Sequence, residues 1–216
     1  MTAITLFNRR AAVLTLAVLG GLSVQKADAA KITVAGGCFW CVESDFESVA
    51  GVTEVVSGFM GGSVKNPTYK QVVAGGTGHL ESAQIDYDPS KINLKALYDL
   101  FFRSIDPTDA GGQFCDRGAN YATAIFVSSD VERAAAKAAK ADAEKALGQK
   151  IVTPIRDATA FYPAGAYHQN YYKQSKIVLT RFGLTSKAKA YKKYRNACGR
   201  DQRVKQLWGS AAPFAQ

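Results

Sequence analysis

The chain has 216 residues and a formal net charge of +9, from 27 Lys and Arg against 18 Asp and Glu. This length suits one ordinary domain that buries its own core. After residue 30, no stretch reaches the length of a membrane-spanning helix, and no nucleic-acid-binding motif is present. The basic stretch "KAKAYKKYR" (187–195) is better interpreted as the solvated face of a helix.

Residues 1–30 have the three parts of a secretory signal peptide. "MTAITLFNRR" ends in Arg9 and Arg10, an apolar run of 14 residues follows, and "ADAA" (27–30) offers small residues for cleavage. The paired arginines also fit a twin-arginine export signal, and a buried N-terminal helix is the alternative. We therefore expect an exported, periplasmic protein whose single domain spans 31–216. Residues 1–30 carry a net charge of +2, so the mature chain carries +7.

The mature chain opens with a predicted strand that leads into a helix. "KITVA" (31–35) is β-branched and ends at Gly36 and Gly37, which indicates a tight turn. After the turn, apolar residues recur at helical spacing from Phe39 to Val49. Cys38 should therefore lie at the helix N-terminus, and Cys41 one turn later on nearly the same face.

The remaining elements alternate between strands and helices. Asn93 is the predicted N-cap of a helix over 93–105. Ser129 and Glu132 suggest a capping box for an alanine-rich helix that Gly148 ends. Together these features predict an α/β fold (an α+β two-layer sandwich), with a mixed β-sheet covered by helices and an irregular C-terminal tail from about residue 176. The predicted strands cover 52–59, 81–88, 121–127 and 150–155, the last at a sheet edge because of Pro154.

The Cys-x-x-Cys pair in "GGCFWC" admits several readings. A zinc site is disfavoured, because Cys115, Cys198 and the two histidines are isolated. A buried structural pair fits a glycine turn poorly, whereas the helix N-terminus favours a reactive thiolate at Cys38. A thioredoxin-like disulfide oxidoreductase and a non-enzymatic binding module are the two alternatives to an enzyme that uses Cys38 as its nucleophile.

Four blocks in order carry a resemblance to a known family. "GGCFWCVESDF" resembles the signature of the A-type peptide methionine sulfoxide reductases, which act on the S epimer. The blocks at 57–92 ("SGFMGGSVKNPTYK…"), 106–126 ("DPTDAGGQFCDRGANY…") and 161–172 ("FYPAGAYHQNYY") resemble the family's further motifs. The resemblance implies thiol-dependent reduction of methionine sulfoxide, protein-bound and free, through a cysteine sulfenic acid and then a disulfide, which repairs oxidised proteins.

The resemblance assigns a role to each matched residue. Cys38 is the implied nucleophile, and Glu81 the implied acid, whose pKa an apolar pocket should raise. His79 and His168 match family positions and are expected to be structural. Phe39 and Trp40 match the pocket for the substrate methyl group, and Tyr69, Tyr121 and Asp116 match groups around the sulfoxide oxygen.

Three positions depart from the commonest family pattern. Cys41 stands where glycine is usual, Phe114–Cys115 replaces Gly–Asn, and Gly165 replaces an acidic residue. A cysteine at position 41 also occurs in the family. The other two departures leave the local geometry of the site open, but not the reaction.

Three thiols compete to resolve a sulfenic acid on Cys38. Cys41 is one turn away, Cys198 lies in the tail where the family often has a recycling cysteine, and Cys115 is next to Asp116. We expect Cys198 to take part in recycling, with Cys41 nearly as favoured. A structural Cys115–Cys198 disulfide is the alternative for that pair.

The expected partners follow from this chemistry. They are oxidised proteins, free methionine sulfoxide and a thioredoxin-like reductant, with no metal, no bound cofactor and no nucleic acid. We expect a monomer with no stable membrane insertion once the signal peptide has been removed.

Overall fold

The computed structural model describes residues 1–2 and 30–215. The predicted signal peptide, residues 1–30, therefore lies almost wholly outside the described residues. Within the described part of the chain, no helix combines the length and apolarity needed to cross a membrane.

A six-stranded sheet forms the centre of the domain, in the order β7-β6-β1-β3-β2-β8. All neighbouring strands are antiparallel except β6 and β7, so the sheet is mixed as predicted. Its strands are β1 (Ala30–Gly36), β2 (Val52–Met60), β3 (Leu80–Tyr87), β6 (Thr123–Val127), β7 (Ile155–Asp157) and β8 (Tyr162–Pro163).

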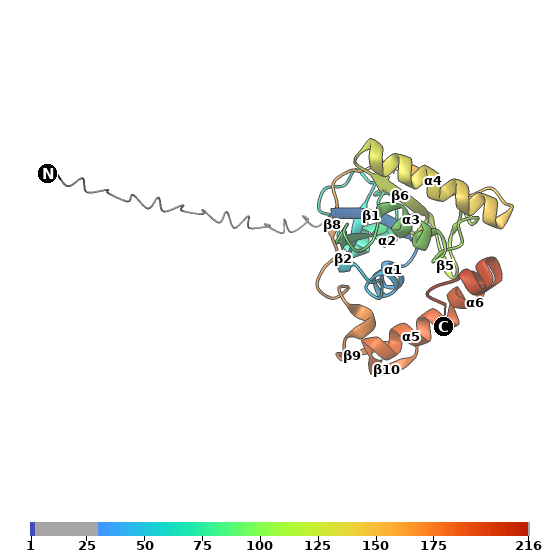
Figure 1. Cartoon of the computed structure of the whole chain (residues 1–216). Coiled ribbons are helices and arrows are strands. Elements are labelled where there is room, and N and C mark those ends of the chain that lie inside the picture. Colours follow the sequence, from blue (N-terminus) through green and yellow to red (C-terminus); the bar gives the residue numbers. More distant parts are fainter. Residues whose placement is uncertain (3–29, 216) are drawn as a thin grey trace.

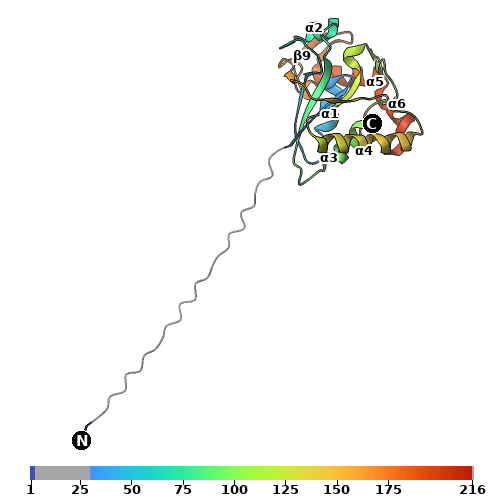
Figure 2. The same cartoon turned by 90° about the horizontal axis from the view of Figure 1, so that it is seen from above.

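Helices cover one face of this sheet (Figures 1 and 2). Helix α3 (Leu94–Phe102) packs beside α4 (Asp130–Leu147), and both contribute to the main core with Ile32 and Ile85 of the sheet. The predicted Asn93 cap is present, because Asn93 Oδ1 accepts the Ala96 N–H at 2.8 Å. The capping box predicted for α4 is only half formed: the Ser129 hydroxyl accepts the Glu132 N–H at 3.2 Å, but the Glu132 carboxylate accepts the Ser128 N–H. Helix α1 (Phe39–Phe46) follows β1, and the short α2 (Tyr69–Ala74) follows β2.

The predicted strand at 150–155 is wrong in its position. Residues 150–154 are irregular, and β7 begins only at Ile155. Pro154 has no N–H for a sheet ladder, but its carbonyl accepts the Ile125 N–H at 3.0 Å. The chain therefore joins the sheet just after the proline, as an edge strand parallel to β6.

The C-terminal tail is ordered, in contrast to the irregular tail expected from the sequence. It forms a hairpin of β9 (Ile177–Thr180) and β10 (Gly183–Ser186), followed by α5 (Lys187–Ala197) and α6 (Arg200–Trp208). The Ser186 hydroxyl caps α5 by accepting the Lys189 N–H at 3.3 Å. Trp208 reaches the main core, so apolar burial holds the tail in place.

Smaller elements complete the chain. A two-stranded hairpin of β4 (Gly112–Gln113) and β5 (Asp116–Arg117) precedes β6. The 3₁₀ turns are η1 (Ala119–Tyr121), η2 (Tyr171–Lys173) and η3 (Gly209–Ala211).

Candidate active site

A glycine turn positions Cys38 at the start of α1. Gly37 has φ +77°, and a Cβ built there would lie 2.5 Å from Cβ of Gln113, so a larger residue is excluded by both conformation and space. Cys38 is the N-cap residue, and its carbonyl accepts the Cys41 N–H at 3.1 Å. The two cysteines thus lie one helical turn apart on the same face of α1.

A pocket of about 70 Å³ opens beside Cys38 and brings together every predicted catalytic and substrate-binding residue. A larger hollow of about 460 Å³ lies behind α1, but its lining contains no cysteine. The smaller pocket is lined by Cys38, Phe39, Trp40, Tyr69, Glu81, Asp116, Tyr121 and Tyr194.

Glu81 is a buried carboxyl group at the base of the pocket. It is 2% exposed, and its Oε2 accepts the Phe39 N–H at 3.1 Å. Desolvation raises its pKa to about 8, against a single backbone hydrogen bond that lowers it. The pKa of Glu81 is therefore raised as expected, and its carboxyl group is mostly protonated at neutral pH.

The resting state of Cys38 differs from the thiolate expected from its position. Its side chain is 6% exposed, and burial raises the pKa of the thiol well above its ordinary value. The first N–H of the helix, which would stabilise a thiolate, is instead bonded to Glu81. The neighbouring Cys38 thiol is the main cause of a lowered Cys41 pKa, helped by Arg200 and Arg195.

Two phenols of the pocket remain protonated at neutral pH. Tyr69 and Tyr121 both line the pocket beside Cys38. Burial raises the pKa of Tyr121 to about 12, and it raises the pKa of Tyr69 further. Both hydroxyls can therefore donate hydrogen bonds to an oxygen atom bound in the pocket.

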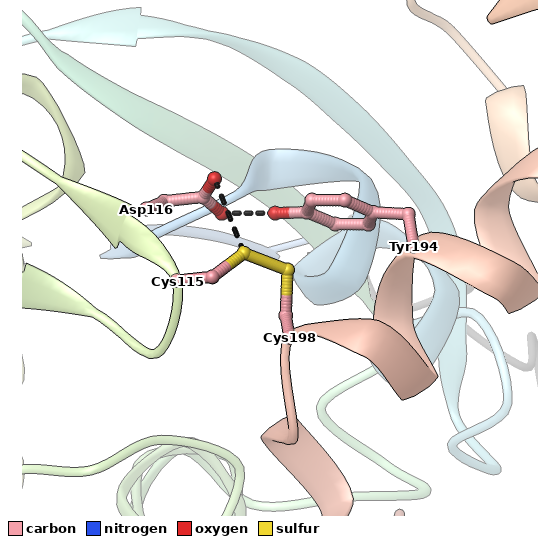
Figure 3. Close-up of a disulfide and its surroundings, with 4 residues drawn as sticks. All are labelled: Cys115, Asp116, Tyr194 and Cys198. Atoms are coloured by element: carbon pink, nitrogen blue, oxygen red, sulfur yellow. Dashed lines mark hydrogen bonds between the residues drawn. A yellow bond between two sulfur atoms is a disulfide. The ribbon is translucent and has the colours of Figure 1, made fainter. Parts of the chain in front are cut away.

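Tyr194 is the pocket residue that the sequence did not reveal. It comes from α5, and its hydroxyl donates to Oδ2 of Asp116 (Figure 3). Its ring meets Trp40 edge-on, with centroids 6.4 Å apart. The one sequence signal for Tyr194 is its position one helical turn before Cys198. This signal points to the pocket only when Cys198 is known to be bonded to Cys115, the neighbour of Asp116.

Aromatic stacking fixes the wall of the pocket. Trp40 stacks on Tyr171 with centroids 3.8 Å apart and on His168 at 5.7 Å. Burial lowers the pKa of His168 to about 4, so its imidazole is neutral and packs as an aromatic ring. His79 bridges a loop, accepting from the Gly62 N–H at Nδ1 and bonding the Val64 carbonyl at Nε2. These contacts fit the structural role expected for both histidines.

The four cysteines form one disulfide and one thiol pair. Cys115 and Cys198 are bonded to each other, with Cα atoms 4.9 Å apart across 83 residues of sequence (Figure 3). Cys38 and Cys41 are free and buried, whereas Cys115 is exposed. The structure therefore pairs Cys198 with Cys115, and the roles of Cys198 and Cys41 in recycling stay predictions.

Charged residues of the tail hold the back of α1. Arg195 donates to Asp45 at 2.6 Å, and both side chains are buried. Arg200, which is 2% exposed, donates to the carbonyls of Gly36 at 3.3 Å and Ser104 at 2.8 Å. Within residues 30–215, no group of three or more His, Cys, Asp or Glu side chains is placed to hold a metal ion.

Comparisons with known proteins agree with this geometry. The family described as peptide methionine sulfoxide reductase matches residues 30–208. The chain is 46% identical over 178 residues to "Peptide methionine sulfoxide reductase MsrA 2" of Rhizobium meliloti, covering 82% of this chain and 83% of the relative. It is 44% identical over 181 residues to the MsrA of Limosilactobacillus reuteri, covering 81% and 94% of the two chains.

Solved structures give the same result. The reduced form of Mxr1 from Saccharomyces cerevisiae superposes with a TM-score of 0.63 at 32% identity, over 66% of this chain and 83% of that one. Methionine sulfoxide reductase A of Corynebacterium diphtheriae superposes with a TM-score of 0.59 at 29% identity, over 72% and 78% of the two chains.

Proposed function

Because the chain belongs to the A-type peptide methionine sulfoxide reductase family, we propose that its pocket reduces methionine sulfoxide with Cys38 as nucleophile and Glu81 as acid. Membership of this family makes the chain an oxidoreductase that acts on methionine sulfoxide, which decides against the disulfide oxidoreductase and the non-enzymatic binder. The observation that carries the residue assignment is the protonated, buried Glu81 in the same small pocket as the free thiol of Cys38.

In the first step, the Cys38 sulfur attacks the sulfur of the sulfoxide. Glu81 gives its proton to the sulfoxide oxygen, and the thiol proton returns to the Glu81 carboxylate. The oxygen then moves from the substrate sulfur to the Cys38 sulfur as the bond between the two sulfur atoms breaks, so Cys38 is left as sulfenic acid and the substrate departs as methionine. Tyr69 and Tyr121 donate hydrogen bonds to the oxygen as its negative charge develops, while the Phe39 and Trp40 rings hold the methyl group.

In the second step, we assign the Cys41 thiol to attack the sulfenic acid, forming a Cys38–Cys41 disulfide and releasing water. The lowered pKa of Cys41 and its place one helical turn after Cys38 support this assignment. When Cys115 and Cys198 are both thiols, exchange passes the disulfide to them and restores the Cys38 and Cys41 thiols.

Accessibility supports the direction of this relay. Cys38 and Cys41 are 6% and 2% exposed, so a protein reductant cannot dock on their sulfur atoms, whereas Cys115 lies at the surface. An external dithiol, for which we propose a thioredoxin-like protein, then reduces the Cys115–Cys198 disulfide. The form seen here, with one disulfide and the catalytic thiols free, corresponds to the stage just before that reduction.

The relay is tested by counting turnovers without a reductant. Fully reduced enzyme should yield two methionines per chain, because two dithiol pairs accept the oxidation, and the double variant Cys115→Ser/Cys198→Ser should yield one. The double variant should keep turnover with dithiothreitol and lose it with thioredoxin. A single methionine from the unmodified enzyme, or normal thioredoxin-driven turnover of the double variant, contradicts the relay. Cys38→Ser should yield none.

We also propose that the enzyme works in the periplasm, on the basis of the charged, apolar and small-residue parts of residues 1–30. Its reductant would then be a thioredoxin-like domain on the outer side of the cytoplasmic membrane. Fractionation of cells that produce the full chain, and a chain lacking residues 2–30, tests this. Activity of the full chain found only in the cytosol contradicts the proposal.

A further inference from the structure

The β9–β10 hairpin presents an apolar face to solvent. Leu179 and Leu184 are cross-strand partners, so their side chains lie on the same face, and Ile177 follows two residues before Leu179. These three side chains are 81%, 76% and 58% exposed, whereas Val178 on the opposite face is partly buried. We call Ile177, Leu179 and Leu184 the hairpin face. Three large apolar side chains exposed together on one face make a candidate interaction site.

The chain around the hairpin face is strongly basic. Between residues 158 and 200 there are nine Lys and Arg residues and no Asp or Glu; six of the nine are exposed, whereas Lys187, Arg195 and Arg200 are buried. Lys176 immediately precedes β9, and Arg181 lies in the turn between the strands, and both are exposed. A partner that combines apolar and acidic residues complements this surface.

The turn of the hairpin lies at the rim of the active-site pocket. The Arg181 guanidinium packs over the rings of Phe182 at 4.8 Å and Tyr194 at 5.8 Å. Tyr194 itself lines the pocket, and the Arg181 charge lowers the pKa of the neighbouring Asp116 against the larger effect of burial. The turn of the hairpin therefore lies next to Tyr194, which lines the pocket, and the hairpin face is on the two strands that this turn joins.

The pocket is too small for more than the end of one side chain. Its volume of about 70 Å³ is well below the roughly 300–1,000 Å³ of pockets that enclose a whole small-molecule ligand. A polypeptide whose methionine sulfoxide occupies the pocket must therefore lie across the surface around the rim. Folded proteins bury most of their apolar side chains, so an unfolded segment is the form that offers apolar residues to the hairpin face.

From these observations we propose that the hairpin face binds the unfolded polypeptide substrate, at apolar and acidic residues that flank its methionine sulfoxide. The strands of the hairpin pair only with each other within the described residues, so an extended substrate could also add to an edge. This inference rests on the proposed function, because it names the substrate that the pocket serves.

The test compares a small and a polymeric substrate, with dithiothreitol as reductant. The variant Leu179→Thr/Leu184→Thr should leave kcat/KM for free methionine sulfoxide unchanged. For an unfolded, oxidised protein, its KM should rise on the order of tenfold with kcat unchanged, because two leucine contacts are lost. Val131→Thr is the matched control, since Val131 is 73% exposed on α4 and should affect neither substrate.

A pair of peptides sharpens the prediction. Two unstructured peptides of equal length each carry one methionine sulfoxide, flanked by Leu and Glu in one and by Ser and Lys in the other. The unmodified enzyme should prefer the first, added salt should reduce that preference, and the double variant should lose most of it. Equal use of both peptides by the unmodified enzyme overturns the proposal.

Other outcomes separate the remaining explanations. If the double variant loses activity equally on free and polymeric substrate, the hairpin supports the fold and the proposal is wrong. A defect seen only with a protein reductant would assign the face to the reductant and also overturn the proposal. Failure of the unmodified enzyme on both substrates would instead refute the proposed function, together with this inference.

Discussion

Replacing Glu81 with glutamine removes the proton that the mechanism requires but preserves the shape of the side chain. Glutamine Oε1 can still accept the Phe39 N–H, so the start of α1 should remain in place. General acid catalysis typically contributes about 10²- to 10⁴-fold. We therefore expect kcat/KM of Glu81→Gln at pH 7 to fall by an amount in that range.

The pH dependence of this loss follows from the Glu81 pKa of about 8. About nine-tenths of the enzyme carries the Glu81 proton at pH 7 and about one-tenth at pH 9. The Cys38 thiolate fraction changes with pH in both enzymes, so it largely cancels in their ratio. The ratio of kcat/KM between unmodified enzyme and variant should therefore fall roughly tenfold between pH 7 and pH 9.

The assay measures initial rates with free methionine sulfoxide and excess dithiothreitol, at low substrate, from pH 6 to pH 10. Circular dichroism of both proteins across this range checks that they remain folded. A ratio that stays constant with pH, or a variant as active as the unmodified enzyme at pH 7, would refute the role of Glu81 as a proton donor.

Three further predictions concern the effect of Glu81 on stability and the roles of Tyr194 and Arg195 in α5. The pKa of Glu81 is higher in the folded than in the unfolded protein, so its stabilising effect is complete below about pH 4.5 and is lost as pH rises through about 8. Between pH 6 and 9 the free energy of unfolding should therefore fall by on the order of 2 to 3 kcal/mol more in the unmodified enzyme than in Glu81→Gln. Urea denaturation of both proteins at each pH measures this difference. Tyr194→Phe removes the hydroxyl bonded to Asp116 and should lower kcat/KM about tenfold with little change in melting temperature; unchanged kinetics would show that this hydroxyl plays no part in the reaction. Arg195→Met leaves Asp45 buried without its closest cation and should destabilise the fold by about 3 to 5 kcal/mol, with Arg195→Lys costing less; equal melting temperatures of Arg195→Met and the unmodified enzyme would contradict the importance of this pair.

The sequence predicted much of the fold because its local signals agree with the tertiary contacts. Asn93 and Gly148 mark helix ends in both sequence and structure, and Gly148 adopts the left-handed conformation that ends a helix. The strand at 150–155 was misplaced because β-branched residues favour a strand locally, whereas the available partner edge of β6 fixes where pairing begins. The short α2 was missed because six residues give little periodicity.

The sequence predicted those site residues that lie inside a recognisable motif. It did not predict the residue that the C-terminal tail adds to the pocket. Glu81 and Tyr69 lie inside recognisable blocks, and both line the pocket. Tyr194 lies outside every block, and only the fold brings α5 to Asp116. The charge state of Cys38 was also beyond the sequence, because it depends on which group accepts the Phe39 N–H and on burial that no local pattern encodes.

The active-site turn is completed by Arg200, which is synthesised long after the turn itself. Its guanidinium reaches from α6 to the carbonyl of Gly36, 164 residues earlier, at the turn that presents Cys38. Contacts of such long sequence separation form late, because the chain between them must first be ordered. In a nascent chain that lacks α6, the carbonyls of Gly36 and Ser104 do not have Arg200 as a hydrogen-bond donor. The turn that presents Cys38 is then not yet fixed in its final position. Cysteine reactivity should consequently appear only at the end of folding, once the last helix has docked.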